Sequence, residues 1–478
     1  MEQQKKPLYQ ALMEHKKKGP ISFHVPGHKY GQIGDFGLDS SFESILTIDV
    51  TELTGLDDLH SPEEAILEAE LLLANLYQVK NSFFLVNGST VGNIAMIMAV
   101  CSEDDVVLVQ RNCHKSVLNA LQLAKARPIF LEPEYHPDWK VAGGVQPETV
   151  AKAIEQYPMA KAIILTYPNY YGMVYDLKEI IDQAHLQNIP VLVDEAHGAH
   201  FILGNPFPAS AIQLGADIVV QSAHKTLPAM TMGSYLHFNS DLINLNKVKE
   251  YLGIFQSSSP SYPIMASLDL ARSYLARYGS NDLCYLHERT NHFKEQLAEI
   301  PTIKVLEYPN NQGDLLKITI QSKSEMNGFE LQKRLEGLGI YTELADPYNI
   351  LLILPLLKEG QPYPFTETAD KLKQILQHFT YQDKVGKLYM EQTEKVSGLA
   401  IGYKEMDHLF VKDVPFIQAH HHVCAETIIP YPPGIPLLLK GERITSEKLE
   451  RLQHLIMTGA RFQGGSHLKE GYITIFQT

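Results

Sequence analysis

From residue 82 to residue 223 the sequence alternates short apolar runs with longer amphipathic segments, and this alternation limits the folds that the chain can adopt. The apolar runs are SFFLVN, DDVVLVQ, RPIFLEP, KAIILTYP, IPVLVDEA and ADIVVQSA. Short runs rich in Val, Ile and Leu that are separated by amphipathic helices are typical of βαβ units. We therefore expect an α/β domain whose mainly parallel sheet is covered by helices on both faces.

The pattern changes near residue 300, where four expected strands and one expected helix indicate a small α+β domain. The strands are TIKVLE, LLKITIQ, IYTELA and NILLILPL, and the helix is NGFELQKRLEGLG. A length of 478 residues fits two or three domains. We predict an N-terminal arm (1–60), a large domain (61–295), the small domain (296–382) and a C-terminal domain (383–478).

Composition excludes several classes of protein. The formal net charge of −14 argues against nucleic acid as a partner. No apolar run is long enough to span a bilayer, and the basic N-terminal stretch lacks the apolar segment of a secretory signal. The four cysteines are scattered and form no CxxC pair, which predicts a cytoplasmic protein without a cysteine-built zinc site. The run His420–His422 lacks acidic or cysteine ligands at metal-site spacing, so we predict a polar loop and no metal.

A lysine follows the last apolar run, in the stretch ADIVVQSAHKTLPAM at residues 216–230. A lysine after a strand is ordinarily a solvated loop residue, because burying an ammonium group is costly. The alternative is that Lys225 carries a neutral, nucleophilic amine that forms a Schiff base. Ser222 and His224 would then hold a cofactor phosphate or orient the Schiff base. The choice depends on the rest of the chain.

Three other polar sites come at the ends of predicted parallel strands, where open α/β sheets bind ligands. Gly88-Ser89-Thr90 lies between a strand and a helix. Backbone N–H groups at a helix N-terminus, together with two hydroxyls, form a cradle suited to a phosphate. The alternative for Ser89 and Thr90 is an ordinary helix N-cap.

Asp194 closes the buried run in VLVDEAHGAH, and a buried carboxylate needs a partner. One suitable partner is the protonated pyridine nitrogen of pyridoxal phosphate, whose role as an electron sink depends on that charge. His197 could brace the same carboxylate or the ring. The letters DEAH also occur in a helicase motif, but that motif needs an upstream GxxxxGK[ST], which is absent here.

His114, in QRNCHKSVLNA, could stack on an aromatic cofactor or could be a solvated histidine at a helix N-terminus. Its neighbour Lys115 could compete with Lys225 for the Schiff base, but Lys115 lies at the expected start of a helix. A phosphate loop, a stacking histidine, a strand-end Asp-x-x-His and a Ser-x-His-Lys, in this order, together favour pyridoxal phosphate.

These and further motifs resemble the ornithine/lysine/arginine decarboxylase family, which uses pyridoxal phosphate and has the aspartate-aminotransferase fold. The resemblance extends over nearly the whole chain through FHVPGHKYG, LDDLHSP, FFLVNGSTVGN, RNCHKSV, VLVDEAHGAH, SAHKTLPAMTMGS, SSSPSYPIMASLD and IIPYPPGIPLLLKGE. It implies that Ser89, Thr90 and Ser222 contact the cofactor phosphate and that His114 stacks on the ring. It also implies that Asp194 pairs with the pyridinium nitrogen, that His197 makes a further cofactor contact and that Lys225 forms the Schiff base. The phosphate loop begins at Gly88, so we expect the long N-terminal wing domain of the large inducible members to be absent. Shorter members are linked to polyamine or agmatine synthesis.

The reaction is predicted from the residues that would surround the substrate carboxylate. An aminotransferase typically grips this group with a bidentate arginine of the small domain, and none follows NILLILPL. Arg272 or Arg443 would have to reach the site instead. Decarboxylation benefits from a poorly solvated carboxylate, so we predict an α-decarboxylase for arginine first and lysine or ornithine second. A regulator of the same fold would need a helix-turn-helix head, for which the basic N-terminal stretch is too short.

Two further predictions concern the substrate side chain and assembly. A cationic side chain requires a carboxylate, for which Glu343, Asp346 and Glu426 are candidates, although each could be a solvated loop acid. The stretch SSSPSY at 257–262 could simply cap the helix that follows. The family resemblance implies that it reaches the neighbouring subunit's cofactor phosphate through Ser258 and Ser259. We therefore expect a homodimer with shared active sites.

Overall fold

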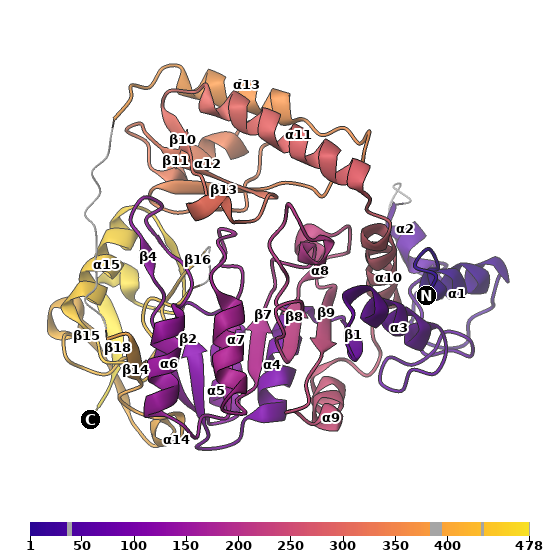
Figure 1. The fold of residues 1–478 in the computed structure, drawn as a ribbon, viewed down its shortest axis with the longest axis horizontal. Coiled ribbons are helices and arrows are strands. Elements are labelled where there is room, and N and C mark those ends of the chain that lie inside the picture. Colours follow the sequence, from indigo (N-terminus) through magenta and orange to yellow (C-terminus); the bar gives the residue numbers. More distant parts are fainter. Residues whose placement is uncertain (36–40, 383–393, 432–434, 478) are drawn as a thin grey trace. The chain divides into compact units, whose positions relative to one another are not determined.

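The computed structural model describes residues 1–35, 41–382, 394–431 and 435–477. Their contacts divide the chain into two compact units. Figure 1 shows the elements of the chain, coloured from the N-terminus to the C-terminus. Unit 1 comprises residues 1–100, 190–205 and 209–279, and unit 2 comprises residues 101–189, 206–208 and 280–478. The predicted start of the C-terminal domain, at residues 383–393, lies outside the described residues.

Unit 1 contains a run of four neighbouring strands in the order β1-β9-β8-β7. Their bounds are Asn81–Leu85 for β1, Ser234–Phe238 for β9, Ile218–Gln221 for β8 and Val191–Asp194 for β7. Strands β7 and β8 are parallel, with Asp194 opposite Val220, whereas β9 is antiparallel to both of its neighbours. Because β7 and β8 are parallel, the residues that follow them emerge at one edge of the sheet.

Seven α-helices and one 3-10 turn accompany these strands among the described residues of unit 1. They are α1 (Pro7–Lys17), α2 (Ser41–Leu46), α3 (Ala65–Tyr77), α4 (Gly88–Val100), α8 (Ala223–Thr226), α9 (Leu245–Phe255), α10 (Tyr262–Ala276) and η1 (Phe201–Leu203). Helix α4 packs closely on the sheet at Gly92, where a Cβ atom would lie 2.7 Å from Leu85 and 2.8 Å from Val220. A glycine there lets the helix approach β1 and β8.

Unit 2 contains a second run of strands, in the order β6-β2-β3-β14. The bounds are Ala162–Thr166 for β6, Val106–Gln110 for β2, Arg127–Leu131 for β3 and Val396–Gly398 for β14. The first three strands are parallel, as predicted, and β14 adds an antiparallel edge. The accompanying helices are α5 (Lys115–Leu123), α6 (Pro147–Gln156) and α7 (Leu177–His185), and a short hairpin joins β4 (Tyr135–His136) to β5 (Val141–Ala142).

The segment predicted to be a small α+β domain contains a four-stranded antiparallel sheet, which belongs to unit 2 and has the order β10-β11-β13-β12. The strands are Ile303–Val305, Lys317–Ser322, Asn349–Ile353 and Leu344–Ala345. A capping box of Asn327 and Glu330 starts α12 (Gly328–Glu336), as expected for an Asn-x-x-Glu sequence. Helices α11 (Ser280–Ala298) and α13 (Phe365–Leu376) lie side by side, and η2 spans Pro309–Asn311.

The C-terminal part of unit 2 is built from short elements around its own apolar core. They are α14 (Tyr403–Met406), β15 (Val411–Pro415), η3 (Phe416–Gln418), β16 (Ile429–Tyr431), α15 (Ser446–Met457), β17 (Arg461–Gln463), η4 (Leu468–Glu470) and β18 (Tyr472–Phe476). Helix α15 was predicted, whereas the two small antiparallel pairs β15–β18 and β16–β17 were not. In the described part of the chain, no helix is both long and apolar enough to cross a membrane. The same residues contain no cluster of three or more His, Cys, Asp or Glu that could bind a metal ion.

Candidate active site

The predicted phosphate loop forms the N-terminus of α4 in unit 1. Gly88 has a positive φ of 79°, which lets the chain turn sharply from β1 into the 13-residue helix. The Ser222 hydroxyl, which follows β8, donates a hydrogen bond to the Ser89 hydroxyl at 2.8 Å. Thr90 is an exposed residue of the same first turn. Unpaired N–H groups of a helix N-terminus and adjacent hydroxyls suit a phosphate, so these residues fit the predicted ligand.

Asp194 lies at the end of β7 and is only 2% exposed. Its Oδ2 accepts a hydrogen bond from Asn93 Nδ2 at 2.8 Å, and its Oδ1 accepts one from the Ala196 N–H at 3.2 Å. No Lys or Arg of the described residues forms an ion pair with this carboxylate. A buried carboxylate is stabilised by a cationic partner, which the N–H⁺ of a pyridinium ring could supply.

Asn93 was not predicted from the sequence as a partner of Asp194. The residue belongs to the apolar helix α4 and is fully buried. A polar amide within such an apolar stretch, VGNIAMIMAV, was the available signal. Buried polar side chains nearly always have a hydrogen-bond partner, and here the partner is the predicted site residue.

Lys225 is located on the short helix α8, directly after β8, as the sequence predicted. Its Nζ lies 3.1 Å from Nε2 of His197, which comes from the turn after β7. The two parallel strands thus bring Asp194, His197 and Lys225 to the same edge of the sheet in unit 1. His224 is held in the turn toward β9, because its Nδ1 and its backbone N–H both contact the Gly233 carbonyl, at 2.9 and 3.1 Å.

His114 belongs to unit 2, where it is the N-cap of α5. Its Nδ1 accepts a hydrogen bond from the Ser116 N–H at 3.2 Å and lies 2.9 Å from the Ser116 hydroxyl. Because Nδ1 acts as an acceptor, the neutral ring carries its proton on Nε2. Ring stacking by His114 stays a prediction. The neighbouring Lys115 donates through Nζ to Gln463 at 2.7 Å.

The three acids predicted to recognise the substrate all lie in unit 2. Glu343 accepts a hydrogen bond from the Tyr170 hydroxyl at 2.8 Å, and Asp346 accepts one from the Tyr171 hydroxyl at 2.5 Å. Asp346 also accepts from the Tyr348 and Asn349 N–H groups, and burial raises its pKa. Adjacent tyrosines therefore place Glu343 and Asp346 close together.

Glu426 occupies a different place in unit 2. Its carboxylate accepts hydrogen bonds from the Gly465 and Thr474 N–H groups, at 2.9 and 3.0 Å, and so braces the C-terminal elements. The hydrogen bonds that Asp346 and Glu426 accept are those of structural acids. Substrate recognition by all three residues stays a prediction.

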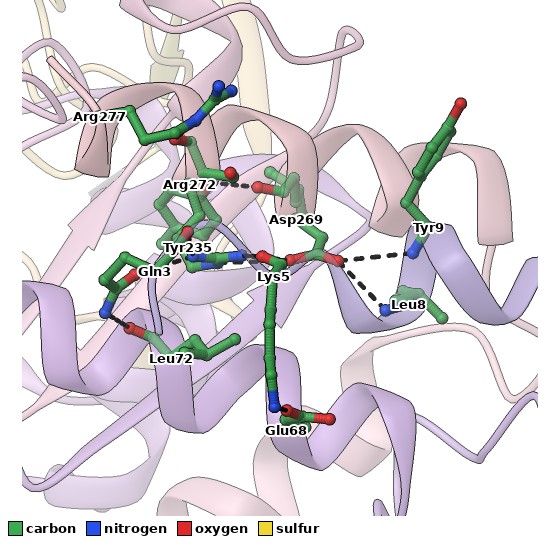
Figure 2. Close-up of polar contacts among 12 residues, drawn as sticks. Gln3, Lys5, Leu8, Tyr9, Glu68, Leu72, Tyr235, Asp269, Arg272 and Arg277 are labelled. Carbon is green, nitrogen blue, oxygen red and sulfur yellow. Dashed lines mark hydrogen bonds and ion pairs between the residues drawn. The ribbon is translucent and has the colours of Figure 1, made fainter. Parts of the chain in front are cut away.

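Arg272 was a candidate to grip the substrate carboxylate, and the structure gives it a different function. Its side chain is fully buried on α10 and pairs with Asp269 at 2.9 Å (Figure 2). It also donates to the Gln3 carbonyl and side chain at 3.0 and 2.8 Å, and to the Lys5 carbonyl. The guanidinium therefore fastens the N-terminal segment to α10. Arg443, the other candidate, donates to the His421 carbonyl at 2.8 Å.

The predicted interface stretch lies beside the phosphate loop of its own unit. The Ser257 N–H donates to Asn87 Oδ1 at 3.4 Å, and Asn87 directly precedes Gly88. The Ser257 hydroxyl donates to the Ser259 carbonyl at 3.1 Å, and both Ser258 and Ser259 are exposed. Contact of Ser258 and Ser259 with a second subunit stays a prediction.

Comparison with known proteins places the chain in a family. Residues 6–315 match the family model described as Orn/Lys/Arg decarboxylase, major domain, and residues 382–467 match the C-terminal domain of the same family. An uncharacterized protein of Bacillus subtilis, YaaO, is 47% identical over 98% of each chain. An arginine decarboxylase of Bacillus anthracis is 35% identical over 97% of this chain and 96% of its own. The chain belongs to the Orn/Lys/Arg decarboxylase family.

Solved structures confirm the predicted fold class. The lysine decarboxylase LdcF of Francisella novicida superposes with a TM-score of 0.80 and 22% identity, covering 98% of this chain and 81% of that one. A ureidoglycine–glyoxylate aminotransferase of Bacillus subtilis superposes with a TM-score of 0.54 and 13% identity, covering 68% and 87%. Together with the family match, these findings support an amino-acid decarboxylase that acts on a basic amino acid, and they do not fix which one.

Proposed function

We propose that this protein uses pyridoxal phosphate to decarboxylate arginine, with lysine and ornithine as the next candidates. The observation that carries the cofactor assignment is the set at one sheet edge of unit 1. There, Asp194 ends β7 while Lys225 and Ser222 follow β8. The preference for arginine is supported by the curated relatives named arginine decarboxylase, at 35% and 33% identity.

The residues at this edge match the chemistry of each part of the cofactor. Ser89, Thr90 and Ser222 would hold the phosphate, Asp194 would pair with the pyridine nitrogen, and Lys225 would bind the aldehyde carbon. When bound there, pyridoxal phosphate supplies an electron sink for the pair of electrons that departing CO₂ leaves behind.

His197 is proposed as a positioning residue for Lys225. A lysine amine attacks a carbonyl carbon only when it is neutral. The His197 Nε2 atom, 3.1 Å away, can accept a hydrogen bond from that neutral amine and direct its lone pair. The Asn93 amide supports Asp194 in the same way, because its hydrogen bond to Oδ2 favours the ionised carboxylate.

Decarboxylation is preferred over transamination because Arg272 is not available to bind the substrate carboxylate. An aminotransferase needs a guanidinium available to grip the substrate carboxylate. Arg272 already pairs with Asp269 and donates to Gln3 and Lys5, so it is committed to the N-terminal segment. The aminotransferase alternative would therefore need another arginine.

The test is to offer arginine, lysine and ornithine separately to the purified protein and to measure CO₂ and products. We expect CO₂ and the corresponding amine in equal amounts from one of the three, and none from the Lys225→Ala variant. Keto acids without CO₂ would establish the aminotransferase alternative. The expected products are agmatine, cadaverine or putrescine, and we therefore assign the reaction to polyamine synthesis. We further propose that the protein acts in the cytoplasm as a homodimer.

A further inference from the structure

Unit 1 contains a cavity of about 340 Å³ that none of the predicted cofactor residues lines. It is lined by residues of α3, β1, α9 and the loop at residues 59–63. Much of its wall is aliphatic, with Leu67, Leu71 and Leu252 among the lining residues. Cavities with apolar walls and a few fixed polar groups are the usual form of small-molecule sites.

A buried carboxylic acid, Glu70, lies in the wall of this cavity. Its side chain belongs to α3 and is 6% exposed. The Phe84 N–H donates to Oε1 at 2.9 Å, and within the described residues no hydrogen bond reaches Oε2. Burial is the main cause that raises the pKa of Glu70 to about 8. In the described part of the chain, the Oε2 oxygen therefore faces no protein donor and is available to accept a hydrogen bond from a ligand in the cavity.

Within the described residues, none of the charged groups around Glu70 donates a hydrogen bond to Oε2. Asp57 raises the pKa of Glu70 and Lys249 lowers it, and the other titratable groups that line the cavity are His60, Glu63 and Lys80. Lys80 is already bound to Asp241 and to the Ser240 carbonyl. Lys249 is exposed and, among the described residues, contacts no acid closely enough for an ion pair.

We propose that this cavity binds an alkylammonium cation, with its N–H groups donating to Glu70 Oε2 and its methylene chain lying along Leu67, Leu71 and Leu252. A cationic donor satisfies the free oxygen and stabilises the ionised carboxylate in its buried position. The aliphatic wall contributes by removing the chain from water. The proposal concerns binding alone and does not depend on the decarboxylation proposed above.

The test is calorimetric titration of the holoprotein with 1,5-diaminopentane at pH 7, in buffers of different ionisation enthalpy. Because the Glu70 pKa is about 8, we expect binding at this site to release close to one proton to the buffer. Glu70→Gln keeps the acceptor for the Phe84 N–H but removes the charge. It should weaken this binding at least about tenfold and abolish the proton release. Glu68→Gln, the same change on an α3 residue outside the cavity lining, should bind like the wild type.

A second variant keeps the proposal falsifiable if Glu70→Gln does not fold. The nearest atom to a Cβ built at Gly253 is His60 Nδ1, at 3.9 Å, so a leucine there would extend into open space within the cavity. Gly253→Leu should block diamine binding while Glu70 remains. Absence of proton release from the wild type, or unchanged diamine binding in either folded variant, would overturn the proposal.

Discussion

Lys115 and Lys225 each follow a histidine, and their amines are held in different ways. Lys225 Nζ contacts the His197 ring at 3.1 Å, whereas Lys115 Nζ donates to the Gln463 amide at 2.7 Å. We expect Lys225→Ala to abolish covalent attachment of the cofactor, because it removes the nucleophilic nitrogen. Lys115→Ala, the matched control, should retain attachment. Visible absorbance, and mass spectrometry after borohydride reduction, measure it. A borohydride-reducible bond in the Lys225→Ala protein would refute the assignment.

The charge of Asp194 is expected to matter more than its shape. Asp194→Asn keeps the size of the side chain but cannot hold a pyridine nitrogen protonated, and it places an amide opposite Asn93. Charge-assisted hydrogen bonds contribute about 1.5–3 kcal/mol, so turnover should fall by about 10- to 100-fold or more in a protein that stays folded. Steady-state kinetics and circular dichroism measure the two effects.

Asp217→Asn provides the control for Asp194→Asn. Asp217 is another buried carboxylate, and it accepts the Val191 N–H at 2.8 Å at the opposite end of the β7–β8 pair. This variant should lose stability and keep the turnover of its folded fraction. Equal turnover in the Asp194→Asn and wild-type proteins would contradict the electron-sink role.

At the scale of elements, a buried ion pair joins α10 to the N-terminal segment. Asp269 pairs with Arg272 and also accepts the N–H groups of Leu8 and Tyr9, at 3.1 and 3.4 Å, at the start of α1 (Figure 2). Arg272→Met leaves a buried carboxylate without its cation, which should lower the free energy of unfolding by about 3–5 kcal/mol. Urea unfolding measures the loss.

The exposed pair of Glu367 and Lys371 on α13 is the control for this prediction. Their side chains are 63% and 36% exposed, and Lys371→Met should cost less than about 0.5 kcal/mol. If the Arg272→Met variant unfolds at the same urea concentration as Lys371→Met and the wild type, the pair of Asp269 and Arg272 does not stabilise the N-terminal segment.

A second element-scale feature is a network of buried hydrogen bonds around Glu195, the residue that follows Asp194. Glu195, the residue after β7, is fully buried and accepts hydrogen bonds from Ser210, Ala211 and Gln221 at 2.7, 2.6 and 2.6 Å. Gln221 in turn contacts His237 of β9 at 3.1 Å. Burial raises the pKa of Glu195 from 4.5 to about 8.

This shift gives stability a predictable pH dependence. Between pH 4.5 and about 8 the folded protein keeps a proton on Glu195 that the unfolded chain has released. The free energy of unfolding therefore falls as pH rises through that window. Glu195→Gln, which cannot titrate, should show a shallower fall, by up to about 1.4 kcal/mol per pH unit. Urea titrations at several pH values measure the slope, and equal slopes would contradict the buried, protonated state. Glu70, whose pKa is also raised, lowers the free energy of unfolding with rising pH in the wild type and in Glu195→Gln alike.

The elements that the sequence predicted are those with a local signal. Apolar runs such as residues 163–165 identify buried parallel strands, and the predicted helical stretch NGFELQKRLEGLG contains α12. Strand β14 was missed because three residues, Val396–Gly398, become a strand only by pairing with β3, more than 250 residues earlier. The hydrogen bond from Asn93 to Asp194 was missed for the same reason, since no spacing rule connects a helix amide to a carboxylate on a strand.

At the scale of the whole molecule, strand order explains why some of the predicted site residues lie close together. Ser89 and Ser222 are separated by 133 positions and still meet, because the ends of buried strands converge at one sheet edge. Strand order gave no such information about the predicted substrate acids. Glu343, Asp346 and Glu426 were chosen for charge alone, and charge does not reveal that Glu426 accepts backbone N–H groups from residues 465 and 474.

Assembly is the remaining whole-molecule prediction, and several exposed residues of unit 1 support a homodimer. Ser258 and Ser259 are exposed next to the loop that precedes Gly88. The N-terminal segment exposes large apolar side chains, with Ile21 84% and Phe23 95% accessible. Exposed apolar patches often mark protein–protein contacts.

If a neighbouring subunit's Ser258 and Ser259 contact the cofactor phosphate, cofactor binding and dimerisation must stabilise each other. Sedimentation should then show a dimer for the holoprotein and easier dissociation after the cofactor is removed. The double variant Ser258→Ala/Ser259→Ala should dissociate more readily and bind cofactor more weakly, whereas Ser102→Ala, at another exposed serine, should behave like the wild type. A fully active monomer at assay concentration would exclude shared sites, because each catalytic centre would then be complete within one chain.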